Sequence, residues 1–393
     1  MLSHRNILFN ARAAAKVFAV YREDLFLSFL PLSHMLERTV GYYIPLLCGA
    51  TVAFARSVPD LPEDLLRQRP TILISVPRIY ERVYNKIHAQ LASTSSFAQG
   101  LFQRAVDAGW RRFRGGSGGL AWPLLKLLVA DKVLAKLGGN LRLAICGGAP
   151  LSAEVAKTFI GLGLNLIQGY GLTETSPIIS GNPQDDNEPA SVGVPLPGIE
   201  VKIGADDELL TRSPSVMLGY WHNPEATEAM IDAGGWLHTG DQVRMENHHI
   251  YITGRLKEII VLSNGEKVPP VDMEMAIALD PLFEQVLVVG EGRPFLTALA
   301  VLNPEHWRQA AQGLGLDPAD PAALETKAAR ALVVGRIGAQ IKGFPGYAKI
   351  RAVALQLTPW GIDDETLTPT LKLRRNAILA RDAERIARMY EGH

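Results

Sequence analysis

The sequence predicts an α/β protein with a large N-terminal α/β domain that includes a β-rich subdomain, followed by a small α+β C-terminal domain. Three observations support this prediction. The chain has 393 residues, more than one ordinary hydrophobic core supports. Short apolar runs alternate with helical patterns through the first two-thirds of the chain. Beyond Ala190 the pattern changes to short strands separated by glycine and proline, and a second alternating region follows Gly254.

The strands expected in the large domain are short apolar runs. They cover residues 25–30, 50–55, 71–76, 141–146 and 165–168. Helical patterns lie between them, at residues 61–68, 77–91 and 153–162. Because buried apolar strands alternate with helices, we expect a largely parallel sheet that helices cover on its faces.

A further set of elements is expected after residue 254. It comprises strand patterns at residues 258–262 and 285–289, helical patterns at residues 270–279 and 321–340, and a polar closing helix at residues 373–390. A domain boundary is expected near residues 255–258. We therefore predict a large domain over residues 1–254 and a small domain over residues 259–393.

Composition excludes several classes of protein. The chain has 40 Lys and Arg residues and 40 Asp and Glu residues, whereas nucleic-acid-binding proteins usually carry a basic excess. Cys48 and Cys146 lie in separate segments, so neither a disulfide framework nor a zinc site is expected. No apolar run reaches the roughly 18 residues of a membrane span. We expect a cytoplasmic protein that binds no nucleic acid.

The segment at residues 168–177 reads Gln-Gly-Tyr-Gly-Leu-Thr-Glu-Thr-Ser-Pro and follows an expected strand. Its two glycines let the backbone approach a flat ligand, against which Tyr170 can stack. Thr173 can donate a hydrogen bond to a phosphate, and Glu174 is a hard-oxygen ligand suited to Mg²⁺. Taken alone, the segment has an ordinary polar turn as its alternative interpretation.

Three further segments carry chemical groups. Residues 147–152, Gly-Gly-Ala-Pro-Leu-Ser, close a strand and start a helix with Ser152 at its N-cap. Asp241 and Arg255 are separated by one expected hairpin, so together they can hold both hydroxyls of a ribose. Near the C-terminus, a loop presents Lys372.

These four segments, in this order, resemble the AMP-forming adenylating superfamily of acyl-CoA synthetases, luciferases and peptide-synthetase adenylation domains. The resemblance covers nearly all of the chain. It implies a two-step reaction with ATP, Mg²⁺ and CoA, in which a carboxylate attacks the α-phosphate of ATP and the CoA thiol then displaces AMP. The expected function is that of a long-chain fatty acid–CoA ligase, and the expected partners are its small-molecule substrates.

The resemblance also implies residue roles. Lys372 bridges the attacking carboxylate and the phosphate, where charge develops. Thr173 contacts phosphate, and Glu174 is the Mg²⁺ ligand. ATP or AMP is bound by a set of ten residues in which Gly148, Ala149 and Tyr170 sandwich the adenine: Gly147, Gly148, Ala149, Gln168, Gly169, Tyr170, Gly171, Thr173, Asp241 and Arg255.

The resemblance implies that the small domain acts as a lid. Lys257 falls at the family's hinge, at which this domain is expected to swing between the two half-reactions. Ser263 and Gly265 are expected near the path of CoA. For Lys257, a solvated loop charge is an equally open interpretation.

Substrate class is indicated by residues 30–38, Leu-Pro-Leu-Ser-His-Met-Leu-Glu-Arg, which resemble the pocket segment of long-chain ligases. His34 is expected near the carboxylate end of the acyl pocket. Amino-acid-activating relatives place an acidic residue here, and none occurs between Phe29 and Met35. A structural histidine with local partners is the alternative, and both interpretations stay open.

Residues 97–137 contain seven Lys or Arg residues and two Asp residues, with Trp110, Phe113 and Trp122 interspersed. This composition is compatible with peripheral contact to an anionic membrane. An ordinary solvated helical excursion is the simpler interpretation.

The family's Gly/Ser/Thr-rich phosphate loop directly precedes a segment like residues 1–8, so the resemblance implies that the large domain is incomplete here. The first 21 residues are basic and free of acid, but this position favours a helix capped by Ser3 over a transit peptide. Three interpretations follow: a longer ligase that starts upstream, a non-catalytic chain that binds nucleotide or acyl-adenylate, and one half of a split ligase. In each case the 393-residue form is expected to be impaired in adenylation.

Overall fold

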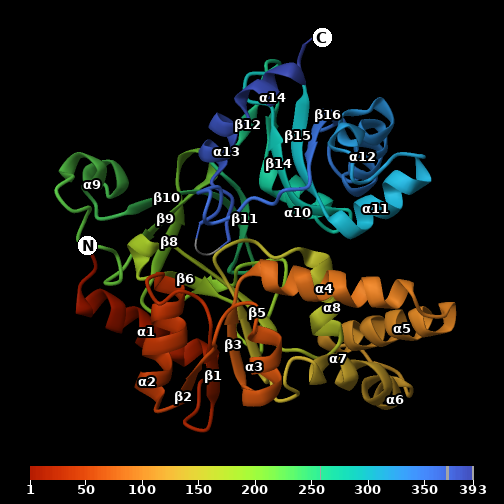
Figure 1. Ribbon diagram of the computed structural model, residues 1–393. Helices are drawn as coiled ribbons and strands as arrows, with labels where there is room; N and C mark the ends of the chain where they lie inside the picture. Colours follow the sequence, from red (N-terminus) through yellow and green to blue (C-terminus); the bar gives the residue numbers. More distant parts are fainter. Residues whose placement is uncertain (257, 369–370, 392–393) are drawn as a thin grey trace. The chain divides into compact units, whose positions relative to one another are not determined.

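The computed structural model describes residues 1–256, 258–368 and 371–391, and the chain divides into two compact units, Met1–Thr253 and Gly254–His393 (Figure 1). This division lies beside the boundary predicted near residues 255–258. Lys257, the predicted hinge residue, lies outside the described residues. Each unit is described by itself below.

A seven-stranded sheet with the strand order β2-β1-β3-β4-β5-β6-β7 forms the centre of the first unit. Its strands are β1 (Leu25–Ser28), β2 (Thr51–Phe54), β3 (Ile72–Ser75), β4 (Leu143–Cys146), β5 (Leu166–Gly171), β6 (Ile178–Gly181) and β7 (Val194–Pro195). Strands β1 to β5 pair in parallel, whereas β6 and β7 are antiparallel additions. The prediction of a largely parallel sheet is therefore confirmed.

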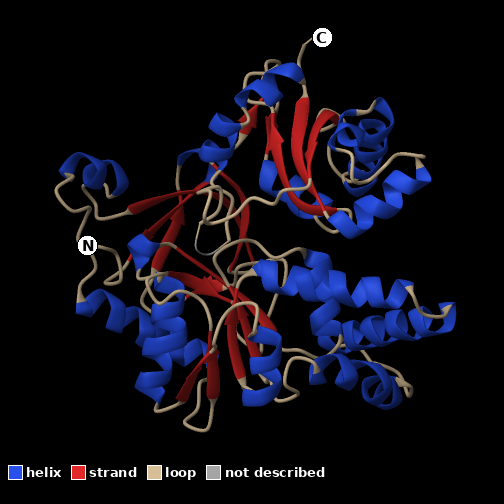
Figure 2. Ribbon diagram, in the orientation of Figure 1, coloured by secondary structure: helices blue, strands red, loops and turns tan. Residues whose placement is uncertain are grey.

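Helices cover this sheet (Figure 2). The helices between residues 4 and 175 are α1 (His4–Phe18), the π-helix η1 (Glu37–Tyr43), α2 (Ile44–Cys48), α3 (Leu61–Gln68), α4 (Pro77–Ala92), α5 (Ser96–Phe113), α6 (Trp122–Leu125), the π-helix η2 (Lys126–Ala130), α7 (Asp131–Ala135), α8 (Ala153–Gly161) and the short 3-10 helix η3 (Thr173–Thr175). Of these, α5 packs on α8, and α6 and η2 pack on α5. The Ser3 cap of α1 is confirmed, because the Ser3 hydroxyl accepts a hydrogen bond from the backbone N–H of Asn6. Ser152 occupies the N-cap of α8, but its side chain makes no capping hydrogen bond.

The core of the first unit lies between the sheet and its helices. Ile72, Ile74, Leu143, Ile145 and Ile167 contribute from adjacent strands, and each is at most 2% exposed. Because these strands are apolar on both faces, the central strands require cover on both sides.

A four-stranded sheet in the order β11-β10-β9-β8 corresponds to the β-rich region expected beyond residue 190. It consists of β8 (Glu200–Ile203), β9 (Glu208–Arg212), β10 (Leu237–Glu246) and β11 (His249–Arg255), with the 3-10 turn η4 (Ala205–Asp207) and helix α9 (Pro224–Met230) in its connections. Strand β9 pairs antiparallel with both β8 and β10.

The second unit contains a three-stranded sheet and a two-stranded ribbon. Its strands are β12 (Ile260–Val261), β13 (Lys267–Val268), β14 (Phe283–Val289), β15 (Leu296–Leu302) and β16 (Ile350–Gln356), and its helices are α10 (Pro270–Ile277), α11 (Pro304–Gly313), the 3-10 helix η5 (Pro321–Glu325), α12 (Lys327–Gln340), α13 (Arg375–Arg381) and α14 (Ala383–Arg388). Strand β15 pairs antiparallel with β14 and parallel with β16.

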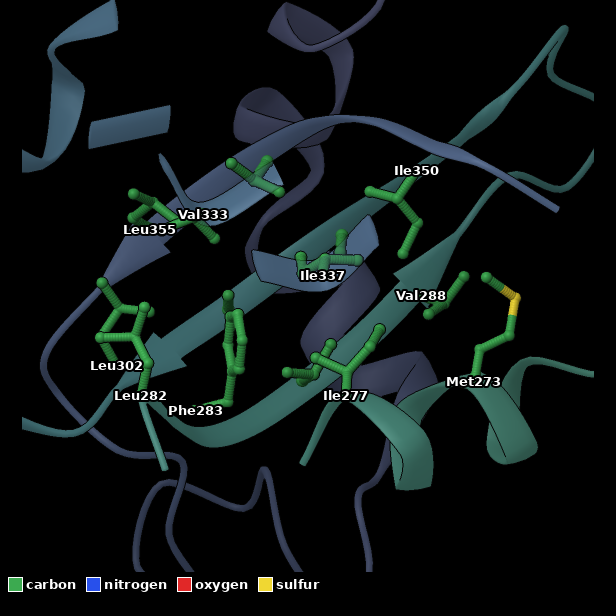
Figure 3. Close-up of a cluster of buried hydrophobic side chains, with 14 of the residues drawn as sticks. Met273, Ile277, Leu282, Phe283, Val288, Leu302, Val333, Ile337, Ile350 and Leu355 are labelled. Carbon is green, nitrogen blue, oxygen red and sulfur yellow. The ribbon is translucent and has the colours of Figure 1, made fainter. Parts of the chain in front are cut away.

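Both faces of the three-stranded sheet are covered. Figure 3 shows one face, on which Met273 and Ile277 of α10 and Val333 and Ile337 of α12 pack against strand residues such as Val288. A separate cluster on the other face joins Leu287 and Leu299 to Ile378 of α13. This double cover explains why every residue of β15 is buried.

The sequence prediction missed β15 and β16 and treated residues 373–390 as one helix. Strand β15 reads Leu-Thr-Ala-Leu-Ala-Val-Leu, a short apolar run rich in helix formers, and periodicity alone does not separate such a run from a buried helix. The closing helix is divided at Asp382 into α13 and α14.

Among the described residues, no helix combines the length and the hydropathy that crossing a bilayer requires.

Candidate adenylate site

Strand β5 carries the central motif of the candidate site. Its last residues form a hairpin with β6, in which Tyr170 lies opposite Ser180 and Gly171 lies opposite Ile178. A Cβ atom on Gly171 would lie 1.9 Å from the carbonyl oxygen of Pro177, so only glycine fits there. Glycine at this position is therefore required by the hairpin itself, in addition to its predicted contact with the nucleotide.

Tyr170 and Asp241 meet although 71 residues separate them. The Tyr170 hydroxyl donates to Asp241 Oδ2 at 2.5 Å. Asp241 lies on β10, is buried, and has its backbone N–H bonded to Thr239 Oγ1 at 3.2 Å. The structure thus brings together the residues predicted to stack on adenine and to bind ribose.

Gln168 joins two of the predicted segments. Its side-chain oxygen accepts from the backbone N–H of Leu151 at 3.1 Å, and its amide donates to the carbonyl of Pro189 at 2.6 Å. Because the side chain is buried, these bonds tie the loop at residues 147–152 to strand β5. Gln168 thus holds the two segments that were predicted to bind nucleotide in position relative to each other.

The loop at residues 147–152 lies close to β5 at Gly147. A Cβ atom on Gly147 would lie 3.3 Å from Leu36 Cδ1 and 3.7 Å from the carbonyl oxygen of Gly169. Gly148 has φ +86°, a left-handed conformation that favours glycine. Ala149 is exposed, as a residue that contacts a ligand requires.

Glu174 and Thr173 lie in η3, directly after β5. Thr173 is exposed, and Glu174 is half-buried. The Tyr220 hydroxyl donates to Glu174 Oε1 at 2.8 Å. Burial, together with this carboxylate, raises the pKa of Tyr220 to about 12, so the phenol remains a donor at neutral pH. Sequence reasoning missed Tyr220, because no motif connects it to Glu174.

Mg²⁺ fits the donor chemistry of Glu174. No cluster of three or more His, Cys, Asp or Glu side chains suited to a metal occurs in the described part of the chain. Mg²⁺ usually needs only one or two protein carboxylates, with water and substrate phosphates completing its shell. A single carboxylate at this position is compatible with that kind of site.

His34 and Glu37 lie beside this region. His34 is half-buried, and its Nδ1 accepts from the backbone N–H of Leu36 at 3.3 Å, a local contact that a structural histidine would make. The π-helix η1 is connected to the motif loop, because the Thr39 hydroxyl donates to the carbonyl of Ser176 at 3.1 Å.

Glu37 is a polar residue of this region that sequence reasoning did not single out. It is 0% exposed, and neither carboxylate oxygen has a hydrogen-bond partner among the described residues. Burial raises the pKa of Glu37 to about 7. A Cβ atom on Gly41 would lie 2.4 Å from Glu37 Oε1, so glycine makes room for the carboxyl.

In the second unit, Lys372 is exposed on a loop closed by its own backbone. The N–H of Thr368 donates to the carbonyl of Lys372 at 2.8 Å, and the N–H of Lys372 donates to Thr368 Oγ1 at 3.1 Å. At the end of the loop, Arg375 forms an ion pair with the largely buried Glu274 at 2.8 Å. The structure therefore presents Lys372 on an anchored loop.

The remaining predicted residues of the second unit lie in two places. Ser263 and Gly265 are exposed in the turn between β12 and β13, where Gly265 has φ +85°. Arg255 is exposed at the end of β11, and its guanidinium lies 3.7 Å from Glu258.

A cavity of about 560 Å³ in the first unit does not coincide with these residues. It is lined by residues of α1 and two prolines: Arg5, Leu8, Phe9, Arg12, Ala13, Lys16, Pro197 and Pro214. None of these lining residues belongs to the four motif segments. The candidate site is therefore defined by the hydrogen bonds that join the motif segments, not by this cavity.

Comparison with known protein families gives two matches. Residues 1–221 match the AMP-binding enzyme family, and residues 257–393 match the C-terminal domain of AMP-binding enzymes.

Curated relatives include ligases of fatty acids. The chain is 36% identical to long-chain-fatty-acid–CoA ligase FadD15 of Mycobacterium tuberculosis over 93% of this chain and 62% of that protein. It is 32% identical to the peroxisomal long chain acyl-CoA synthetase 6 of Arabidopsis thaliana over 100% of this chain and 58% of that protein. The chain thus spans about three-fifths of the length of these relatives.

Solved structures agree in fold. The A domain of carboxylic acid reductase from Segniliparus rugosus, in complex with AMP and a carboxylic acid, has a TM-score of 0.72 at 24% identity and covers 96% of this chain and 58% of that chain. ATP-bound MatB from Rhodopseudomonas palustris has a TM-score of 0.68 at 21% identity, over 97% of this chain and 65% of that chain. The two family matches and these likenesses confirm the resemblance seen in the motifs: the chain belongs to the AMP-binding enzyme family, within the AMP-forming acyl-CoA synthetase superfamily.

Proposed function

We propose that this chain carries the nucleotide and acyl machinery of a long-chain fatty acid–CoA ligase, which forms acyl-CoA, AMP and pyrophosphate through an acyl-adenylate. The observation that carries the proposal is the bond between Tyr170 and Asp241, which joins two motif segments beside the carboxyl ends of parallel strands. Ligands of open α/β sheets bind at this edge. The names of the relatives in Mycobacterium and Arabidopsis support the long-chain acyl substrate.

In the proposed reaction, adenine lies between Tyr170 and the loop of Gly148 and Ala149, while Asp241 and Arg255 hold the ribose. Thr173 donates to phosphate. Mg²⁺ bound at Glu174 would supply neutralisation of charge on the leaving pyrophosphate.

The second unit supplies the remaining groups. Lys372 places its ammonium where charge develops between carboxylate and phosphate. A fatty carboxylate is already ionised at neutral pH, so the adenylation step needs no general base. Lys257 as hinge, and Ser263 and Gly265 beside the CoA path, complete the proposal.

Two alternatives from the sequence stay open: a non-catalytic chain that binds nucleotide or acyl-adenylate, and one half of a split ligase. They differ from a competent ligase in a measurable way. Purified protein is tested for ATP–pyrophosphate exchange with palmitate and Mg²⁺, and in parallel for AMP binding by calorimetry. Exchange supports a competent ligase, AMP binding without exchange supports a nucleotide-binding chain that is impaired in adenylation, and absence of both would contradict the proposal.

The role of Lys372 has its own test, in a form of the protein that shows exchange. Lys372→Ala is expected to abolish exchange while sparing thioester formation from supplied acyl-adenylate and CoA. Lys342→Ala, an exposed lysine of the same unit, is the matched control and should leave both steps unchanged. Equal loss of both half-reactions in Lys372→Ala would contradict the assigned role.

A further inference from the structure

The helical segment formed by α6, η2 and α7 is apolar on two faces. Its inner face packs on α5: Trp122 and Leu125 are each 8% exposed and cluster with Ala105 and Ala108. The ribbon of this segment lies beside α5 (Figure 1).

The outer face carries four exposed leucines. Leu120, Leu124, Leu127 and Leu128 are 103%, 59%, 63% and 40% exposed. Leu120 lies in the turn before α6, and the spacing of three and one residues between Leu124, Leu127 and Leu128 places these three along one stripe of the helical segment. Because a surface helix normally turns polar residues to water, a leucine stripe opposite an already buried face indicates that something else covers it.

Lysines flank the stripe. Lys126, Lys132 and Lys136 are exposed, and Asp131 is the single acidic residue between positions 120 and 137. Asp131 pairs with Lys126 at 2.6 Å, and the Lys136 ammonium donates to Gln90 Oε1 at 3.0 Å. The outer face is therefore a stripe of leucines flanked by side chains with a net positive charge.

This composition distinguishes between two kinds of partner. Protein–protein interfaces are enriched in aromatic residues and arginine and depleted of lysine. Helices that lie in a membrane interface combine leucine on the apolar face with lysine or arginine on the polar face, and each basic residue near an anionic surface adds attraction. Exposed leucine with exposed lysine matches the second pattern.

We propose that residues 120–136 form a lipid-docking face. In this arrangement Leu120, Leu124, Leu127 and Leu128 enter the boundary between headgroups and acyl chains of an anionic bilayer, and Lys126, Lys132 and Lys136 lie at the level of the phosphates. The proposal does not depend on the ligase activity, since it concerns a surface apart from the adenylate motifs. For an enzyme of long-chain acids, it would place the protein where such acids partition.

The test is co-sedimentation of the purified protein with vesicles of phosphatidylcholine alone and of phosphatidylcholine with phosphatidylserine. We expect binding to the anionic vesicles that weakens as salt is raised. Leu124→Ser/Leu127→Ser should lower the partition coefficient about tenfold for each leucine. The matched control is Leu46→Ser/Leu66→Ser, which changes two leucines of similar exposure, 55% and 54%, on α2 and α3.

A second variant tests the contribution of the lysine charges separately from that of the leucines. Lys132→Glu/Lys136→Glu leaves the leucines in place and should abolish the preference for anionic vesicles. Since all these side chains are on the surface, far-UV circular dichroism should be unchanged in each variant.

Three results would overturn the proposal. One is absence of vesicle binding by the parent protein, and another is equal binding by the Leu124/Leu127 variant and its control. The third is self-association, or binding of a protein, that the leucine variant removes while vesicle binding stays the same. Loss of vesicle binding confined to the variants of residues 120–136 would support it.

Discussion

Two glutamates, one in each unit, show how differently a protein can accommodate a carboxyl group: Glu37 is 0% exposed, and the side chain of Glu274 is 12% exposed. Glu37, in the π-helix η1 of the first unit, has no hydrogen-bond partner among the described residues. Glu274, in α10 of the second unit, bonds to the Arg375 guanidinium at 2.8 Å and accepts from the N–H of Val288 at 2.7 Å. Both lie in elements next to motif segments.

The pKa values of the two carboxyl groups reflect this difference. Burial raises the pKa of Glu37 to about 7. Burial also raises the pKa of Glu274, to about 6, and Arg375 offsets part of that rise. A single cation therefore offsets only part of the cost of desolvating an ionised carboxylate. Without a cation, the buried Glu37 carboxyl group favours its neutral, protonated form.

The largest expected effect comes from removing the partner of Glu274. Arg375→Leu leaves a largely buried carboxylate without its cation; breaking a fully buried pair in this way costs about 3–5 kcal/mol, and we expect a loss toward the lower end of that range. Because the chain has two compact units, the loss should appear in hydrogen exchange of β15 amides. Amides of β4 in the first unit serve as the internal control.

If β15 exchange were unchanged in Arg375→Leu, Glu274 would have to gain solvent or another partner in the variant. The paired state would then stabilise the unit less than its geometry indicates.

The next effect is the pH dependence caused by Glu37. Its pKa in the folded protein, about 7, lies above the value of 4.5 expected for the unfolded chain. Folding therefore favours the protonated form, so this stability is complete below pH 4.5 and is lost as pH rises through 7. The difference amounts to about 3 kcal/mol between the two limits. Glu37→Gln cannot ionise and should remove this dependence.

The measurement is urea denaturation of the parent and of Glu37→Gln from pH 5 to pH 8, with hydrogen exchange of β4 amides reporting the first unit. The parent should lose stability relative to the variant as pH rises. Parallel curves for the two proteins would show that Glu37 is already paired or solvated.

A smaller effect is expected at Glu174, a half-buried glutamate with one hydrogen bond from Tyr220 at 2.8 Å. Tyr220→Phe removes this neutral donor and should cost about 1 kcal/mol of stability. The carboxylate then has more free acceptor capacity, so binding of Mg²⁺·ATP should be equal or tighter by calorimetry. Weaker binding in Tyr220→Phe would assign the phenol itself to the nucleotide site.

The smallest effect is expected at Arg374, the neighbour of Arg375. Its guanidinium lies 3.6 Å from Glu365, and the two side chains are 48% and 81% exposed. Exposed pairs contribute about 0–1 kcal/mol, so Arg374→Leu should change β15 exchange little. If Arg374→Leu reduced the protection of β15 amides as much as Arg375→Leu, burial of the partner carboxylate would not explain the different contributions of the two arginines to stability.

Sequence reasoning recovered the elements whose signals are local. The Ser3 cap, the helix at residues 61–68 and the alternation of apolar strands with helices all depend on side chains within a few positions of each other. The sequence missed β15, because an apolar run of leucine and alanine has the same pattern in a buried strand and in a buried helix. It also did not show the break at Asp382, where the side chain forms ion pairs with Arg381 and Arg385.

Within the candidate site, the residue types and their order were determined by the sequence alone, because Tyr170, Glu174, Asp241 and Lys372 stand in recognisable segments. Which of them touch was decided by the tertiary structure. The pairing of Tyr170 with Asp241, the Gln168 bridge to Leu151, and the contact of Tyr220 with Glu174 join positions 17 to 71 residues apart. The isolation of Glu37 likewise depends on complete burial. Such contacts arise only when strands and helices pack, since burial and long-range hydrogen bonds have no periodicity along the chain.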